Sequence, residues 1–101
     1  MIQLQLTIYV NEADRSGDHP LYQVLVRRML QLKIAGATVQ RGVMGFGKHG
    51  SVHHSRLFGV SDDRPIVITA VDDPARLRAA LPELKAMVTE GLLTLHEVEV
   101  P

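Results

Sequence analysis

The densest group of chemically useful residues lies in the segment RGVMGFGKHGSVHH, residues 41–54. Its glycines allow positive φ angles and close approach of a ligand to the backbone, so that successive N–H groups can bind an anion. Arg41, Lys48 and, just beyond the segment, Arg56 could add charge-assisted hydrogen bonds to phosphate. This pattern predicts a phosphate-binding loop. The alternative is a turn shaped by glycine whose basic residues are solvated.

Known phosphate and hydrolase motifs do not describe the segment. The GxxxxGK[ST] spacing of a P-loop is absent, and no βαβ unit surrounds GFG as a dinucleotide fingerprint requires. The likeness of TVQRGVMGFG to an acylphosphatase signature is superficial, because that phosphate loop follows the first strand of its fold. Ser51, His53 and Asp62 could be assembled into a hydrolytic set, but nothing in the sequence orders them. We therefore expect no enzyme.

The histidines of the segment leave two interpretations open. His49, His53 and His54 have a spacing that could converge on Zn²⁺ or Cu²⁺ in a loop. They could instead be exposed, or hydrogen-bond to phosphate or to a backbone carbonyl. No carboxylate lies inside the segment, which favours His49 or His53 as accessory donors to an anion rather than as metal ligands.

Two further side chains could contact a nucleotide. Phe46 could stack on a base, or it could anchor its loop to the protein body. Glu12 follows the first predicted strand and could accept a hydrogen bond from a ribose hydroxyl or an adenine amine. The simpler alternative for Glu12 is a solvated charge in a turn.

Composition limits the class of protein. The chain has 101 residues, 46% hydrophobic and 22% charged, which predicts one domain over residues 1–101. The formal net charge is zero, which argues against broad binding to nucleic acid, and the absence of cysteine excludes disulfides and thiolate sites. Neither a signal peptide nor an apolar stretch of the roughly 20 residues that cross a bilayer occurs. We expect a cytoplasmic protein.

Periodicity predicts the elements of the first two thirds of the chain. Residues 2–10 alternate apolar and polar as a strand, and polar turn formers over residues 11–20 predict a loop. A helix follows from Leu21, with Pro20 in its first turn and Gly36 just past its end. ATVQRGV predicts a second strand, and IVITAV is apolar on both faces, as in a central strand.

A second helix is predicted after the central strand. Asp73 and Pro74 have the types expected of an N-cap and a first helical residue. Pro82 should kink or restart this helix because it lacks an N–H, and Gly91 should stop it.

The final strand, residues 92–100, completes the fold. Its apolar residues change sides between Leu95 and Val98, which predicts a bulge near His96 and Glu97. The order strand, helix, strand, strand, helix, strand predicts an α+β, ferredoxin-like βαββαβ sandwich. Its four-stranded antiparallel sheet would carry both helices on one face.

The other face of such a sheet stays open in a monomer. The central strand offers Val67 and Val71 to that face, opposite Ile66 and Ile68. Covering a few hundred Å² of apolar surface at about 25 cal/mol per Å² is worth roughly 5–10 kcal/mol before association costs. We therefore expect a homo-oligomer.

These segments also resemble a known family. LTIYVNEADR, HPLYQVLVRRM, IAGATVQRGVMGFG, VHHSRL and LPELKAMVTEGLLTLHEV run in the order expected of the PII-like family of uncharacterised proteins, domain of unknown function 190. The resemblance covers nearly the whole chain, and its most specific part is AGATVxRGVxGFGxHGxVH. It implies a fold like that of the PII nitrogen-regulatory signal proteins and a PII-like homotrimer with the open sheet faces turned inward.

The resemblance also implies a function. In PII proteins adenine nucleotides bind between subunits, near the base of a mobile loop that docks on a target such as a membrane transporter or channel. Transferred here, that loop spans about residues 43–56, with Gly42, Gly45 and Gly47 at its base. No cofactor would be obligatory, and an adenine nucleotide would be the effector. The tyrosine-bearing loop signature of PII is missing, which argues against 2-oxoglutarate sensing and loop modification.

We therefore expect a trimeric PII-like regulatory protein that binds a small anionic effector, by resemblance an adenine nucleotide, in clefts between subunits. The expected nucleotide- or anion-binding residues are Glu12, Arg41, Gly42, Gly45, Phe46, Gly47, Lys48, His49, His53 and Arg56. The alternatives are a CutA-like metal-binding trimer that uses the loop histidines, and an interaction module without a ligand.

Overall fold

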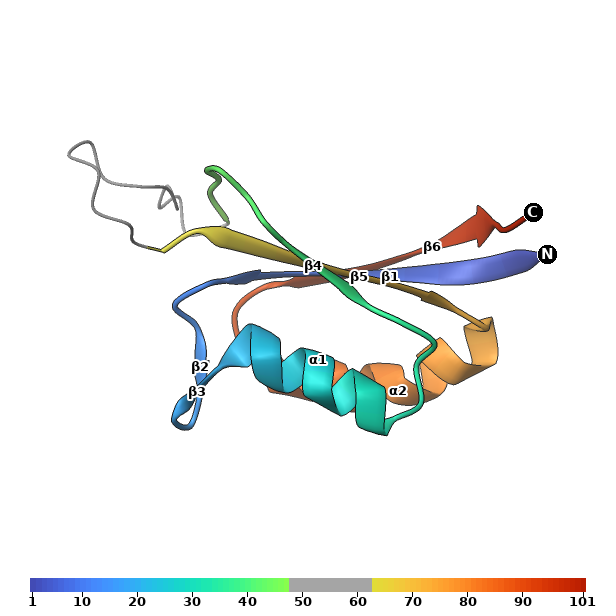
Figure 1. Ribbon diagram of the computed structural model, residues 1–101, viewed down its shortest axis with the longest axis horizontal. Helices are drawn as coiled ribbons and strands as arrows, with labels where there is room; N and C mark the ends of the chain where they lie inside the picture. The colour runs from blue at the N-terminus through green and yellow to red at the C-terminus, as the bar shows by residue number, and fades with distance from the viewer. Residues whose placement is uncertain (48–62) are drawn as a thin grey trace.

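A four-stranded antiparallel sheet with both helices on one face forms the body of this computed structural model, which describes residues 1–47 and 63–101 (Figure 1). The sheet order is β4-β5-β1-β6, and β2 and β3 pair separately. The predicted α+β, ferredoxin-like fold is confirmed. The elements are β1 (Ile2–Asn11), β2 (Arg15–Ser16), β3 (His19–Pro20), α1 (Leu21–Gln31), β4 (Thr38–Arg41), β5 (Pro65–Asp72), α2 (Pro74–Met87) and β6 (Leu92–Glu99).

The core lies between the sheet and the two helices. Alternate residues of β1 and β5 point toward the helices because side chains along a strand change face at every residue. Each helix buries residues three to four apart on one stripe. The buried apolar residues of these elements are Leu4, Leu6, Ile8, Val10, Ile66, Ile68, Ala70, Leu21, Leu25, Met29, Leu77, Ala80 and Leu84.

The opposite face of the sheet carries a row of threonines. The strand register aligns one threonine from each strand: Thr38 faces Thr69, Thr69 faces Thr7, and Thr7 faces Thr94. The neighbouring row, toward the end of the sheet where β4 stops, holds Gln40, Val67, Tyr9 and Leu92. The open face is therefore apolar in part, and β5 is apolar on both faces as predicted.

The segment between β1 and α1 contains a small hairpin instead of the predicted unpaired loop. Ser16 pairs with His19 around a two-residue turn, and Gly17 has φ +61°. Glycine at the first central position is the usual requirement of a type II′ turn. The polar composition indicated the turn, but strands of two residues are too short to leave a periodic pattern.

Helix α1 ends earlier than Gly36, where the sequence pattern predicted its end. Lys33 adopts φ +67°, its N–H donates to the Leu30 carbonyl at 3.1 Å, and the Ile34 N–H donates to the Met29 carbonyl at 3.1 Å. These two bonds define a Schellman end, in which buried Ile34 lies near buried Met29. A lysine therefore occupies the left-handed position that glycine usually fills.

Both helix starts depend on the residue before them. Pro20 lies outside α1, at the N-cap with φ −59° and ψ 133°, rather than in the predicted first turn. Asp73 caps α2 as predicted, and its carboxylate accepts from the N–H groups of Ala75 at 3.0 Å and Arg76 at 3.3 Å. Within the described ranges no helix is long and apolar enough to cross a membrane.

Helix α2 does not restart at Pro82, one of the two outcomes predicted for this residue. It continues through this exposed residue to Met87 and ends before Gly91. Proline lacks the N–H that would bond to the carbonyl four residues earlier and its ring crowds that carbonyl, but the buried stripe of Leu77, Ala80 and Leu84 keeps residues on both sides of it in one helix. The predicted bulge in β6 is also absent.

Strand β6 pairs with β1 without interruption from Leu92 opposite Tyr9 to Glu99 opposite Ile2. The apparent change of register has a different cause. Val98 lies on the open face, whereas Glu97 and Glu99 occupy helix-side positions near the exposed end of the strand. Charged residues are tolerated there because both side chains are exposed to solvent.

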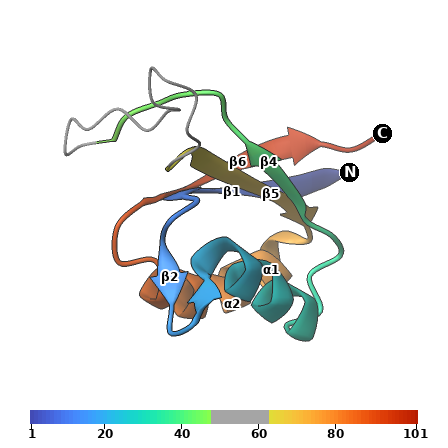
Figure 2. The ribbon, with the colours of Figure 1, turned by 60° about the vertical axis from the view of Figure 1, so that its left-hand side comes forward.

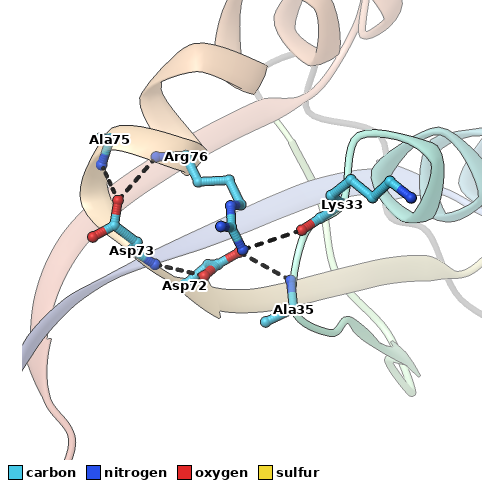
Figure 3. A network of polar contacts seen from close by, with 6 residues as sticks. All are labelled: Lys33, Ala35, Asp72, Asp73, Ala75 and Arg76. Atoms are coloured by element: carbon cyan, nitrogen blue, oxygen red, sulfur yellow. Dashed lines mark hydrogen bonds and ion pairs between the residues drawn. The ribbon is translucent and has the colours of Figure 1, made fainter.

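A buried carboxylate ties the start of β4 to the helical layer (Figure 3). Asp72 accepts from the Ala35 N–H at 2.9 Å and from the Asp73 N–H at 2.7 Å. The Arg76 guanidinium lies 3.6 Å from the same carboxylate and donates to the Lys33 carbonyl at 3.5 Å. Asp72 and Arg76 thus both fix the connection from α1 into β4, because each bonds to a backbone group of that connection.

Candidate functional site

Three segments of chain meet where β4 leaves the sheet. The Glu12 N–H, just after β1, donates to the Arg64 carbonyl at 2.7 Å. The Gly42 N–H donates to the Pro65 carbonyl at 2.7 Å, and an Arg64 guanidinium N–H donates to the Val43 carbonyl at 3.1 Å. The start of β5 therefore holds the ends of both β1 and β4, and fixes the direction in which residues 42–47 depart.

Residues 42–47 border a groove of about 560 Å³. In both ribbon views they rise on the side of the sheet away from the helices (Figures 1 and 2). The described residues that line the groove are Tyr9, Val10, Asn11, Gly42, Met44, Gly45, Phe46, Gly47, Pro65, Val67, Glu90, Gly91 and Leu92. Most of these side chains are apolar or aromatic, and Glu90 is the one carboxylate among them. The groove therefore suits a flat, weakly polar group that hydrogen-bonds at its edge.

The glycines beside the groove differ in what they do. A Cβ on Gly42 would lie 2.7 Å from Cγ of Pro65, so the close packing of β4 on β5 requires glycine there. A Cβ on Gly45 would lie 3.4 Å from the same atom, and one on Gly47 would meet nothing within 4 Å. Only the later glycines leave room for a ligand beside the backbone.

Phe46 exposes 74% of its surface, and its neighbours Val43 and Met44 are exposed as well. An aromatic ring that anchored this segment to the protein body would be buried. Phe46 lines the groove and remains accessible, which is compatible with stacking on a planar ligand.

The two charged residues predicted for the site pair with each other. A guanidinium N–H of Arg41 lies 2.7 Å from a carboxylate oxygen of Glu12, with side-chain exposures of 59% and 23%. Neither residue lines the groove. Arg41 is opposite Ile66, whose side chain is buried under the helices, so the ion pair belongs to the helix side of the sheet.

The predicted site residues thus fall into three groups. Gly42, Gly45, Phe46 and Gly47 lie together along the groove, and Glu12 and Arg41 form the ion pair. Lys48, His49, His53 and Arg56 lie outside the described residues, as do His54 and most of the predicted 43–56 loop. No group of three His, Asp or Glu side chains that could hold a metal ion occurs within residues 1–47 and 63–101.

The sequence interpretation did not include the far wall of the groove. Tyr9, Asn11 and Leu92 lie on the open face, and Glu90 lies in the turn before β6. Alternation along β1 already placed Tyr9 and Asn11 on that face. The topology, which sets β6 beside β1, would have brought the turn at Glu90 to the same end of the sheet.

Comparison with known proteins identifies the class. CPII from Thiomonas intermedia K12, a nitrogen regulatory PII-like protein solved with ADP, AMP and bicarbonate, has a TM-score of 0.68 at 20% identity. That match covers 99% of this chain and 89% of CPII. CutA from Xylella fastidiosa has a TM-score of 0.59 at 17% identity, over 98% of this chain and 83% of CutA. These likenesses show a shared, PII-like fold.

The chain belongs to the DUF190 family, described as "Uncharacterized ACR, COG1993", whose model matches residues 3–100. A UPF0166 protein of Aquifex aeolicus is 32% identical over 95 residues, which cover 94% of this chain and 90% of that protein. The predicted resemblance to this family and to PII-like proteins is confirmed.

Proposed function

We propose that the chain is a PII-like regulatory protein that binds an adenine nucleotide at the groove beside residues 42–47. The observation that carries the proposal is the position of this groove: an apolar and aromatic hollow lies directly against a glycine-containing segment at the end of β4. CPII, which shares the fold, was solved with ADP and AMP.

The parts of the groove match the parts of a nucleotide. Tyr9 and Phe46 offer aromatic surface to a base, and the carboxylate of Glu90 or the side chain of Asn11 could accept from an amine at its edge. Backbone N–H groups near Gly45 and Gly47 would donate hydrogen bonds to phosphate oxygens. Arg41, the last residue of β4, would approach a phosphate from the helix side of the sheet.

A second copy of the chain would complete the site. Tyr9 and Leu92 are 43% and 55% exposed on the open face, and Val67 and Val71 are half-buried there. We propose a homotrimer in which these faces cover one another, with the groove at the junction of two copies. Each chain would act as one domain over residues 1–101, in the cytoplasm and without catalysis of its own.

A partner would be regulated through residues 43–56. The described part of this segment presents Val43, Met44 and Phe46 to solvent, a group of apolar side chains of the kind that protein partners bury. A membrane transporter or channel is the proposed target, and the ligand would act by favouring one conformation of the segment over others.

Binding of the nucleotide can be tested by titration calorimetry and thermal shift with AMP, ADP and ATP. Occupancy at 100 times the dissociation constant should stabilise the protein by about 2.7 kcal/mol. Tyr9→Ala should weaken binding about fivefold or more if the ring stacks on the base, because such stacking is worth about 1–3 kcal/mol. Thr94→Ala, on the same face but outside the groove lining, is the matched control. Failure of all three nucleotides to bind would refute the proposal.

A CutA-like metal-binding trimer is the second candidate, and the chain shares its fold with CutA. Its ligands would be His49, His53 and His54, which lie outside the described residues. Titration with Zn²⁺ and Cu²⁺ separates the candidates, since a saturable heat that is lost in the triple His→Ala variant would support the metal site.

A further inference from the structure

We infer that Glu12 is a built-in competitor for Arg41, which an anionic group of the ligand must displace before it can use that guanidinium. The inference rests on the proposed function, and it names the residue that sets how tightly phosphate is held. It assigns Glu12 a role opposite to the one expected from sequence, in which its carboxylate would accept from ribose or adenine.

The geometry of the ion pair supports this assignment. Arg41 is the last residue of β4, Glu12 follows β1, and β5 lies between those two strands in the sheet. A nitrogen–oxygen distance of 2.7 Å is that of a close ion pair, and it brings the guanidinium of an edge strand across the strand next to it. The carboxylate thus occupies the position on Arg41 that a phosphate oxygen would take.

The backbone around Glu12 keeps this carboxylate near Arg41. The Glu12 N–H is bound to the Arg64 carbonyl at 2.7 Å, and the next N–H, of Ala13, donates to the Asp63 carboxylate at 2.9 Å. Glu12 is also the less exposed partner, at 23% against 59% for Arg41. When an anion approaches, Arg41 is the partner that can turn toward it, and Glu12 stays behind.

Electrostatics then determine the sign of the effect. The pair is neutral as a unit, so an approaching phosphate meets a guanidinium that a carboxylate already satisfies. Removing the Glu12 charge while keeping its shape should weaken its hold on Arg41, since an amide oxygen is a poorer acceptor than a carboxylate, and should take away a charge that repels the anion. Exposed ion pairs are worth about 0.2–1 kcal/mol, which corresponds to anion binding about 1.4- to fivefold tighter.

The experiment is titration calorimetry of the full chain with inorganic pyrophosphate and with ADP. Glu12→Gln should bind both about 1.4- to fivefold more tightly than wild type. Glu99→Gln makes the same change of charge at the opposite end of β1, where Glu99 pairs with Ile2, and should leave affinity unchanged. Arg41→Gln should weaken binding, and the gain from Glu12→Gln should vanish in the Glu12→Gln, Arg41→Gln double variant.

The outcomes separate this inference from the proposed function. If wild type binds ADP and Glu12→Gln binds either ligand equally or more weakly, the competitor role is wrong and the nucleotide site stands. A gain that persists without Arg41 would also overturn the inference. If ADP fails to bind but pyrophosphate binds Glu12→Gln more tightly, and only when Arg41 is present, the nucleotide proposal is wrong and the competitor role is supported. No pyrophosphate binding to any variant would refute the inference.

Discussion

Gly91, in the turn that leads into β6, is the residue whose substitution should damage both stability and the groove. Its φ of +155° belongs to a region that side-chain-bearing residues rarely adopt. A Cβ built there would lie 2.5 Å from the Tyr9 carbonyl oxygen and 2.8 Å from a methyl of Val88. The first contact is with backbone of the central strand β1, which cannot move without disturbing two strand pairs.

The expected loss of stability is the sum of the backbone strain and the steric overlap. Backbone strain of this kind costs about 1–3 kcal/mol, and forced overpacking costs about 1–3 kcal/mol more. We therefore expect Gly91→Ala to lower the free energy of unfolding by about 2–6 kcal/mol. Because Gly91 and Tyr9 both line the groove, ADP affinity should fall in the folded fraction as well.

Urea denaturation followed by circular dichroism measures this change, at one fixed protomer concentration because assembly would shift the midpoint. Gly36→Ala is the matched control. A Cβ at Gly36 meets nothing within 4 Å and the residue has no positive φ, so this variant should be neutral or up to about 1 kcal/mol more stable. If Gly91→Ala unfolds within about 0.5 kcal/mol of wild type, the steric argument is wrong.

Three further predictions concern the ends and the ties of the helices. Lys33→Gly should stabilise the protein by about 1 kcal/mol in urea denaturation, because glycine adopts the observed left-handed conformation without strain; a loss of stability would contradict the Schellman assignment. Asp72→Asn should cost about 1–3 kcal/mol in the same assay, since one amide oxygen cannot replace both oxygens of this buried carboxylate as acceptors for two N–H groups; an unchanged midpoint would argue against the network. The hydrogen bond and charge of Arg28 hold the pKa of Glu83 below its ordinary value, so this ion pair stabilises the fold above the unfolded-state pKa of about 4.3 and stops doing so as pH falls through the lower folded-state pKa. The stability of Glu83→Gln should therefore fall less than that of wild type between about pH 5 and pH 3, and parallel profiles would exclude the effect.

The sequence predicted the order and faces of the main elements because those properties depend on periodicity. The alternation in β1 and the apolar stripes of the two helices, which include Leu25 and Leu84, are local patterns of the sequence. The residues of these patterns are the ones that the fold buries. The N-cap at Asp73 was equally predictable, because its side chain bonds to N–H groups only two and three residues away.

The errors arose where tertiary packing overrides a local rule. Pro82 was expected to kink or restart α2, but the helix continues through it, because the local cost of proline on an exposed face is outweighed by the buried stripe opposite. Gly36 was expected to end α1, whereas buried Ile34 draws the chain back onto Met29 and forces Lys33 into the left-handed region. No single-residue preference contains this information.

The candidate site was predictable only in part for a similar reason. Gly42, Gly45 and Gly47, which border the groove, are close together in sequence and could be found as a motif. The opposite wall comes from Tyr9 and Glu90, which are distant in sequence and carry no motif, and the pairing of Arg41 with Glu12 depends on a strand register that composition does not encode.

The neighbouring residues Arg41 and Gly42 lie on opposite faces of one sheet, so the register of β4 on β5 decides which face each of them reaches. A slip by a single residue along β5 would turn the guanidinium into the apolar hollow and point Gln40 toward Glu12 instead. The bond from Gly42 to the Pro65 carbonyl, and the lack of room there for any Cβ, act as a stop against such sliding. Insertions or deletions between Thr38 and Gly42 should therefore be far more harmful than their position on a short, solvent-exposed edge would suggest.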